Sequence, residues 1–190
     1  MGAKGDSAKK RILEAAHSLF SRKGYCGVTM KDVTEAAGFS RGGLYRHFAS
    51  TEELFLELIR LEQADAIRAL ENALAAKLPP DQILRGFLTS RMHQVCRPEQ
   101  SFSNAVSEFA ANSERGKLAL QERAAGSVQI LTRLIVSGNE AGCFACSQPE
   151  STASLMLWLM EGMSRHAALI PVSDEQICQQ IGLLEKLLRQ

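Results

Sequence analysis

The chain of 190 residues lacks an uninterrupted run of eighteen apolar residues, so no membrane-spanning helix is expected. Its first eleven residues, MGAKGDSAKKR, are charged with no apolar segment behind them, so no signal peptide is expected. The same letters superficially match a myristoylation signal at Gly2, but a basic N-terminal arm fits them better. Five cysteines form an odd number in a chain without an export signal. We therefore expect reduced thiols and a cytoplasmic protein.

Motifs typical of enzymes are also missing. The sequence has no nucleophile elbow, phosphate-binding loop, zinc-binding helix or dinucleotide fingerprint. Strand-like alternation, internal repeats and low-complexity tracts are absent as well, whereas apolar residues recur at helical spacing. We therefore expect an all-α fold, no catalytic residues, no cofactor and no enzymatic activity.

A single C-x-x-C pair occurs at Cys143 and Cys146. A structural zinc site needs two further ligands, and the sequence offers neither a second such pair nor two histidines at ligand spacing. We interpret the two residues as loop cysteines without a role and expect no metal. A metal or redox sensor remains the alternative.

What the sequence does contain is an uneven distribution of charge. The net charge is only +1, but residues 1–48 hold nine Lys or Arg against four Asp or Glu, and residues 49–190 hold thirteen against seventeen. Basic charge is thus concentrated at one end of the chain, as a nucleic-acid partner requires.

The segment TMKDVTEAAGFSRGGLYRHF, which starts at Thr29, has the pattern of two short helices joined by a tight turn. Thr29 and Ser40 are good N-cap residues for the two helices, and Gly38 is the residue type that ends a helix. Leu44 and Phe48 form the buried side of the second helix. This geometry places a recognition helix in the major groove of DNA. A helical hairpin in an ordinary all-α domain is the alternative.

The N-terminal part of the chain resembles the DNA-binding domain of the TetR family of bacterial transcriptional regulators. The matching segments are RILEAAHSLFSRKGY at 11–25, TMKDVTEAAGFSRGGLYRHF at 29–48 and EELF at 52–55. The resemblance implies a three-helix DNA-binding head, a helical C-terminal domain that binds small molecules, and a homodimer. After Phe48 the chain departs from the family, because Ala49-Ser50-Thr51 stands where a lysine is common. Phosphate binding there must use hydroxyls and backbone N–H groups.

Ten residues are candidates for DNA contacts, carried over from the family by position. The base-edge or groove candidates are Lys31, Arg41, Gly42, Gly43 and Arg46; the phosphate candidates are Thr29, Ser40, Tyr45, His47 and Thr51. Arginine suits the acceptor pair of guanine, while hydroxyls and imidazole bond phosphate oxygens. The two glycines allow backbone N–H groups to approach the DNA closely.

About nine helices are expected in all. The first covers residues 7–23, and Ser50 with Glu53 forms a capping box that starts a long helix over residues 51–77. The long helix is expected to connect the head to the remaining domain. Further helices are predicted at 81–97, around 102–112, at 114–139, at 151–170 and from 174 onward. The domains are therefore predicted as residues 1–50, the helix-turn-helix head with its basic arm, and residues 51–190, a helical ligand-binding and dimerisation domain.

Two sets of residues are candidates for functions of the second domain. The ligand-pocket candidates combine bulky apolar side chains with a few polar ones: Phe87, Met92, His93, Phe102, Glu108, Phe109, Met156, Met160 and His166. The dimer-interface candidates lie on the last two helices: Trp158, Met163, Ile177, Ile181, Leu184 and Leu188. Met156, Met160 and Met163 lie on one stripe of the penultimate helix, and such a stripe suits a pocket and an interface equally well. For the last two helices, an ordinary monomer core is the alternative to a dimer interface.

We expect a repressor that binds a palindromic operator as a homodimer and is released by a small, mostly apolar ligand. The alternative is a DNA-binding protein of the same fold that is controlled by a protein partner, or by cysteine redox chemistry or a metal.

Overall fold

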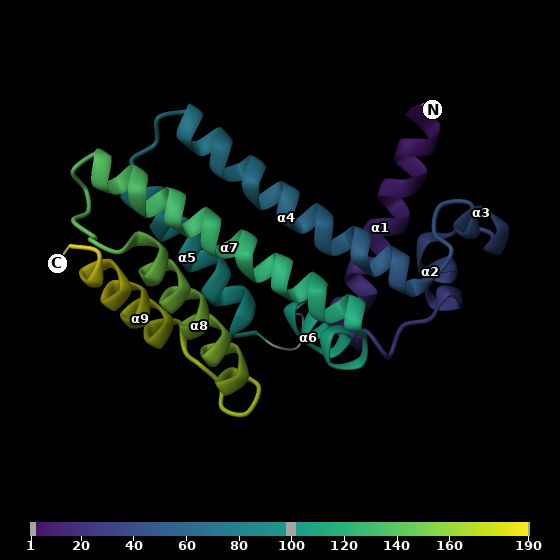
Figure 1. Ribbon diagram of the computed structural model, residues 1–190. Coiled ribbons are helices and arrows are strands. Elements are labelled where there is room, and N and C mark those ends of the chain that lie inside the picture. The colour runs from purple at the N-terminus through teal and green to yellow at the C-terminus, as the bar shows by residue number, and fades with distance from the viewer. Residues whose placement is uncertain (1–2, 98–101, 190) are drawn as a thin grey trace. The chain divides into compact units, whose positions relative to one another are not determined.

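The computed structural model describes residues 3–97 and 102–189, and over these residues the chain forms nine α-helices and no strand (Figure 1). The helices are α1 (Ala3–Lys23), α2 (Met30–Ala37), α3 (Arg41–Tyr45), α4 (Thr51–Ala75), α5 (Pro80–Val95), α6 (Phe102–Asn112), α7 (Glu114–Glu140), α8 (Pro149–Ala167) and α9 (Asp174–Leu187). The predicted all-α fold is confirmed.

Local signals set several of the helix ends. Thr29 and Asp32 form a reciprocal capping box at the start of α2, and Gly38 ends that helix in the left-handed conformation at φ 68°. Ser40 accepts the Gly43 N–H at the start of α3. Ser173 forms a second capping box at the start of α9.

Several predicted helix ends shift by a few residues. Helix α3 ends at Tyr45 rather than Phe48, although the Phe48 N–H still donates to the Leu44 carbonyl. Helix α4 ends at Ala75 rather than residue 77, and Lys77 has a left-handed φ of 54°. Helices α5 and α8 each begin on a proline, Pro80 and Pro149, because the first helical position needs no N–H donor.

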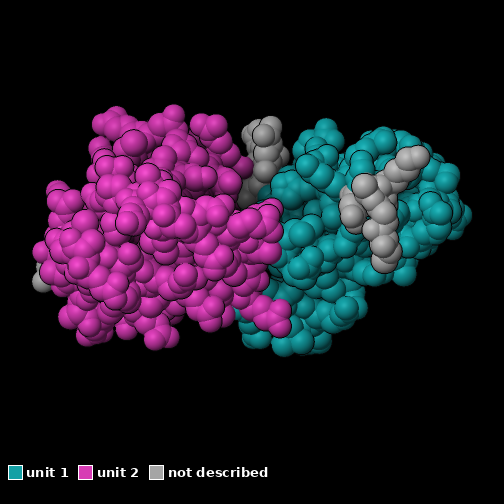
Figure 2. Space-filling view, turned by 90° about the horizontal axis from the view of Figure 1, so that it is seen from above, with its two compact units in different colours: residues 1–62, 99–121 teal, residues 63–98, 122–190 magenta. Residues whose placement is uncertain are grey.

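The described chain divides into two compact units that do not follow its order. Unit 1 comprises Met1–Glu62 and Glu99–Gln121, and unit 2 comprises Gln63–Pro98 and Glu122–Gln190 (Figure 2). Helix α6 therefore belongs with the N-terminal helices, whereas the functional division proposed from the sequence places it in the second domain. Both α4 and α7 contribute residues to both units, so α4 is not the single connection that the sequence suggests.

The core of unit 1 is aromatic. Phe20, Phe55 and Phe109 are fully buried. The ring centroid of Phe55 lies 4.7 Å from that of Phe20 and 4.9 Å from that of Phe102. Tyr25 closes this cluster, with its ring centroid 4.5 Å from that of Phe109. Helix α6 thus supplies two aromatic side chains to the core beneath the candidate helix-turn-helix.

The core of unit 2 is aliphatic and rich in methionine. Met92 of α5 and Met156 and Met160 of α8 are buried together with leucine and isoleucine residues of α7. The inner side of α9 packs on the same core through Ile177, Ile181, Leu184 and Leu188. These four side chains are thus buried within their own subunit, which leaves little of their surface for a partner.

Candidate nucleic-acid interface

The second helix of the helix-turn-helix presents its donor residues to solvent. Leu44 and Phe48 are buried in the core of unit 1, as predicted. Arg41, Gly42 and Arg46 are exposed around them. The apolar residues therefore fix the orientation of α3, and the side chains that could contact DNA lie on the opposite side.

Two contacts organise the start of this exposed face. The Arg41 guanidinium lies 5.5 Å from the centroid of the Tyr45 ring, a cation–π distance that holds the arginine along the helix surface. The Ser40 hydroxyl oxygen accepts the Gly43 N–H at 3.2 Å, which leaves the hydroxyl hydrogen available for a phosphate oxygen. A side chain at Gly42 would meet nothing within 4 Å, so this backbone is open to a close approach.

At the start of the motif, the predicted phosphate ligand Thr29 forms the N-cap of α2. The Thr29 hydroxyl is hydrogen-bonded to the Asp32 carboxylate and also accepts the Asp32 N–H. Thr29 and the Lys23 ammonium, 2.9 Å away, hold the pKa of Asp32 well below its usual range. The Thr29 hydroxyl is therefore engaged in the helix cap. Lys31 is highly exposed, and its ammonium lies 3.9 Å from the Glu35 carboxylate.

Two phosphate candidates lie partly within the fold. His47 is half-buried at the end of the motif. Thr51 is half-buried at the start of α4 and shares a hydrogen bond with the hydroxyl of Tyr25, whose pKa is raised mainly by burial. The exposed part of the predicted set is therefore centred on α3 and Lys31.

Two residues for which the sequence suggested no such role support the turns of the head. Arg11 of α1 donates to the Ala37 carbonyl at 3.2 Å, and its guanidinium lies 5.1 Å from the Phe39 ring centroid. The Glu108 carboxylate of α6 accepts the Tyr25 N–H at 2.6 Å, directly after α1. Arg11 therefore fixes the turn between α2 and α3, and Glu108 fixes the turn between α1 and α2.

The predicted ligand-pocket residues are divided between the two units. Phe102, Glu108 and Phe109 belong to unit 1, where they support the head. Met92, Met156 and Met160 are buried in unit 2, and Phe87 is half-buried against the same core. Sequence spacing alone could not separate these two groups, because both lie on amphipathic helices with the same period.

The two histidines among the ligand-pocket candidates lie at or near the surface of unit 2. His93 lies near the surface with its Nδ1 3.4 Å from the Asp174 carboxylate. His166 is exposed in the last turn of α8. Neither imidazole is enclosed by the apolar core of unit 2.

The two cysteines of the C-x-x-C pair lie in the loop between α7 and α8. Cys143 is half-buried, and Cys146 is buried with its thiol 3.2 Å from the Thr152 hydroxyl. Among residues 3–97 and 102–189, no group of three His, Cys, Asp or Glu side chains is arranged to hold a metal ion. Over the same residues no helix is long and apolar enough to cross a membrane.

We expect a protein with both Cys143→Ser and Cys146→Ser to keep its DNA affinity under reducing conditions. Serine preserves the size of each side chain, and the Asn139 hydrogen bonds to the Cys146 backbone do not involve sulfur. Electrophoretic mobility shift measurements with both proteins would test this. Stoichiometric zinc in the wild-type protein, or loss of DNA binding on mild oxidation that the double variant abolishes, would contradict it.

Comparison with known proteins agrees with the geometry of the head. Residues 12–58 match the family described as bacterial regulatory proteins, tetR family. The chain is 30% identical to YfiR, an uncharacterised helix-turn-helix transcriptional regulator of Bacillus subtilis, over 188 residues that cover 95% of this chain and 88% of YfiR. It is 36% identical to the transcriptional repressor AcnR of Corynebacterium glutamicum over 88 residues, which cover 46% and 44% of the two chains.

A solved structure supports the fold over the whole length. It bears the description "Molecular basis for control of antibiotic production by a bacterial hormones" and is 24% identical, with a TM-score of 0.80 and full coverage of both chains. At that identity the likeness shows the fold alone. The near full-length match to a bacterial helix-turn-helix regulator and the matched head together place this chain in the TetR family of transcriptional regulators, which are not enzymes.

Proposed function

We propose that the protein is a repressor that binds a palindromic operator as a homodimer in the bacterial cytoplasm. The observation that carries the proposal is the exposed surface of α3, where Arg41, Arg46 and the open backbone of Gly42 surround a buried Leu44. Arginine donors on the second helix of a helix-turn-helix are suited to base edges in the major groove. The name of AcnR, a repressor, favours repression over activation.

A homodimer is supported by apolar side chains that the subunit leaves uncovered. Leu155 and Trp158 of α8 and Leu183 and Leu187 of α9 are all exposed, and Trp158 retains 66% of its accessible surface. These residues lie on the opposite side of the two helices from the core. Large exposed apolar side chains on adjacent turns favour an isologous interface. Trp158 therefore stays in the proposed interface, whereas the half-buried Met163 packs against the core of unit 2.

We expect Arg46→Ala to relax the discrimination between base pairs at one position of each half-site. Loss of a bidentate base contact costs about 1–3 kcal/mol of discrimination. Tyr45→Phe is expected to weaken binding by a similar factor for every sequence, because the ring that supports Arg41 remains and only the hydroxyl is lost. Fluorescence anisotropy with an operator and its single-base variants would distinguish the two effects.

The exposed Arg68, in the part of α4 that belongs to unit 2, offers a matched control, since Arg68→Ala removes the same charge outside the head. Wild-type binding should also weaken steeply as salt rises, because phosphate neutralisation releases counterions. Equal, sequence-independent losses for Arg46→Ala and Tyr45→Phe would contradict the assigned roles.

Control by a small, mostly apolar ligand is the second part of the proposal. Its support in unit 2 is the methionine-rich core of α5 and α8, since methionine adapts to ligands of different shape. For the ligand to release the protein from DNA, it must bind more tightly to the form of the dimer that cannot contact two half-sites at once. Because α4 and α7 both have residues in both units, we propose that these helices transmit the preference.

Linkage makes this testable. We expect operator DNA to weaken binding of a ligand found by thermal-shift screening by the same factor by which the ligand weakens DNA binding, typically about 5–150-fold. Isothermal titration with and without operator measures the factor directly. A ligand that binds equally well in both titrations would eliminate the inducer role and favour control by a protein partner.

A further inference from the structure

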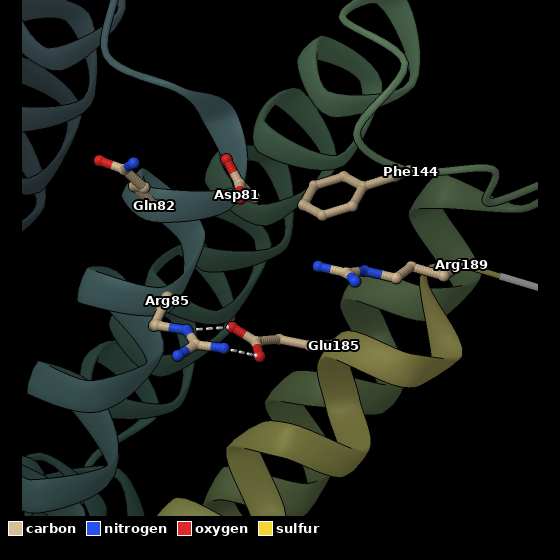
Figure 3. Close-up of a pocket in the computed structure, with 6 residues that line it drawn as sticks. All are labelled: Asp81, Gln82, Arg85, Phe144, Glu185 and Arg189. Carbon is tan, nitrogen blue, oxygen red and sulfur yellow. Dashed lines mark hydrogen bonds and ion pairs between the residues drawn. The ribbon is translucent and has the colours of Figure 1, made fainter.

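Unit 2 contains a pocket of about 220 Å³ that the proposed DNA contacts and dimer do not use. It is lined by Asp81, Gln82, Arg85, Phe144, Glu185 and Arg189, from the start of α5, the loop before α8 and the end of α9 (Figure 3). A water molecule occupies about 30 Å³ in the liquid, so this volume suits a molecule with on the order of ten non-hydrogen atoms.

Hydrogen bonds fix the aromatic wall of the pocket. The Asn139 amide bonds both backbone groups of Cys146, at 2.8 Å and 3.0 Å, and the Ala145 N–H donates to the Leu188 carbonyl at 2.8 Å. The Phe144 ring packs so closely on Gly138 of α7 that a Cβ there would overlap it. The loop is therefore attached to both α7 and the end of α9, and the ring is held in place before a ligand arrives.

An ion pair forms a second wall. The Arg85 Nε donates to Glu185 at 2.6 Å, and a second Arg85 nitrogen bonds the other oxygen of the same carboxylate. This bidentate pair connects α5 to α9 and neutralises both side chains. Neither of them is left to attract a charged ligand.

Two further charged side chains line the pocket, and Asp81 lies within electrostatic range of Arg85. Within the described part of the chain, neither the Asp81 carboxylate nor the Arg189 guanidinium has an ion pair or a side-chain hydrogen bond. Asp81 lies in the first turn of α5, where the positive end of the helix dipole stabilises its ionised form. Figure 3 shows Arg189 reaching toward the space between Phe144 and the Arg85–Glu185 pair.

We propose that this pocket binds a small zwitterion with an apolar group, such as a free amino acid. The carboxylate of the ligand pairs with Arg189, its ammonium pairs with Asp81, and its apolar group lies against Phe144. A ligand with a single charge leaves either Asp81 or Arg189 without a partner, so the pocket selects molecules that carry both. The proposal is independent of DNA binding and of the apolar inducer.

The test is calorimetric titration of the full chain with L-phenylalanine and L-leucine. Two analogues each lack one charge: 2-phenylethylamine has no carboxylate, and 3-phenylpropanoate has no ammonium. We expect both amino acids to bind, and each analogue to bind at least about tenfold more weakly than L-phenylalanine, because charged hydrogen bonds are worth about 1.5–3 kcal/mol.

Variants then locate the site. Arg189→Gln and Asp81→Asn should each weaken L-phenylalanine at least about tenfold. Arg189→Gln should also remove most of the preference for L-phenylalanine over 2-phenylethylamine, which a general loosening of the fold would not do. Lys186→Gln is the matched control, since it removes an exposed positive charge from α9 outside the pocket and should change nothing.

Three results would overturn the proposal. They are no binding of either amino acid up to about 10 mM, analogues that bind as well as the amino acids, and equal effects of Lys186→Gln and Arg189→Gln. Because no DNA is present in these titrations, their outcome is separate from the outcome of the operator experiments.

Discussion

Leu184→Asp is expected to unfold the protein, whereas Leu183→Asp is expected to leave it folded. Leu184 is 3% exposed and packs in the core of unit 2, but the adjacent Leu183 is 53% exposed on the outer side of α9. Truncating a buried leucine costs about 2–5 kcal/mol. The unpaired aspartate adds a further penalty for the loss of hydration. Against a typical stability of about 5–15 kcal/mol, this removes much of the folding free energy.

Urea unfolding followed by circular dichroism would measure the stability of both variants, and size-exclusion chromatography would measure their assembly. Leu183→Asp provides a matched control, because it places the same charge on the same helix one residue away. In the proposed dimer this variant should elute as a folded monomer. If Leu184→Asp instead gave a monomer with wild-type stability, the inner side of α9 would be the interface after all.

Phe109→Ala is expected to destabilise the DNA-binding head by about 3–5 kcal/mol, the usual loss for a buried phenylalanine. The Phe109 side chain is fully buried, and its ring centroid lies 5.3 Å from Phe55 and 4.5 Å from Tyr25. Removing the ring leaves a cavity beneath the turn between α1 and α2. DNA affinity should therefore fall together with the stability of unit 1.

Chemical unfolding and operator binding measured on the same preparations would test this expectation. Ser107→Ala lies on the exposed side of the same helix and should change neither quantity beyond about 0.5 kcal/mol. A Phe109→Ala protein with wild-type stability and altered ligand binding would restore Phe109 to the ligand pocket, where its sequence pattern first placed it.

Glu108 shows why the sequence misplaced α6. A lone acidic residue among Val106, Phe109 and Ala110 resembles a polar group in a ligand pocket, because its partner is far away along the chain. The partner is the backbone N–H of Tyr25, eighty-three residues earlier, and backbone groups leave no trace in a sequence. Helix α6 was recognised correctly, but the core to which it belongs was not.

The charged pocket depended even more on distant residues. Asp81 and Arg189 line the same pocket although they lie far apart along the sequence. In the sequence, each resembles an ordinary surface charge near a helix end. The pair Cys143 and Cys146 drew attention to the right loop for a different reason. In the structure that loop carries Phe144 to the pocket, and its backbone N–H groups donate to the Asn139 side chain and the Leu188 carbonyl.

The sequence by itself determined the features that depend on residues within one or two helical turns. These are the caps at Thr29, Ser40 and Ser173, the left-handed Gly38, the nine helices of the described chain and the exposed arginines of α3. Only the tertiary structure decided which core each helix serves and which of its apolar faces is buried. A helical repeat shows that a face is apolar, but contacts with distant helices determine whether that face meets its own subunit, a partner or a ligand.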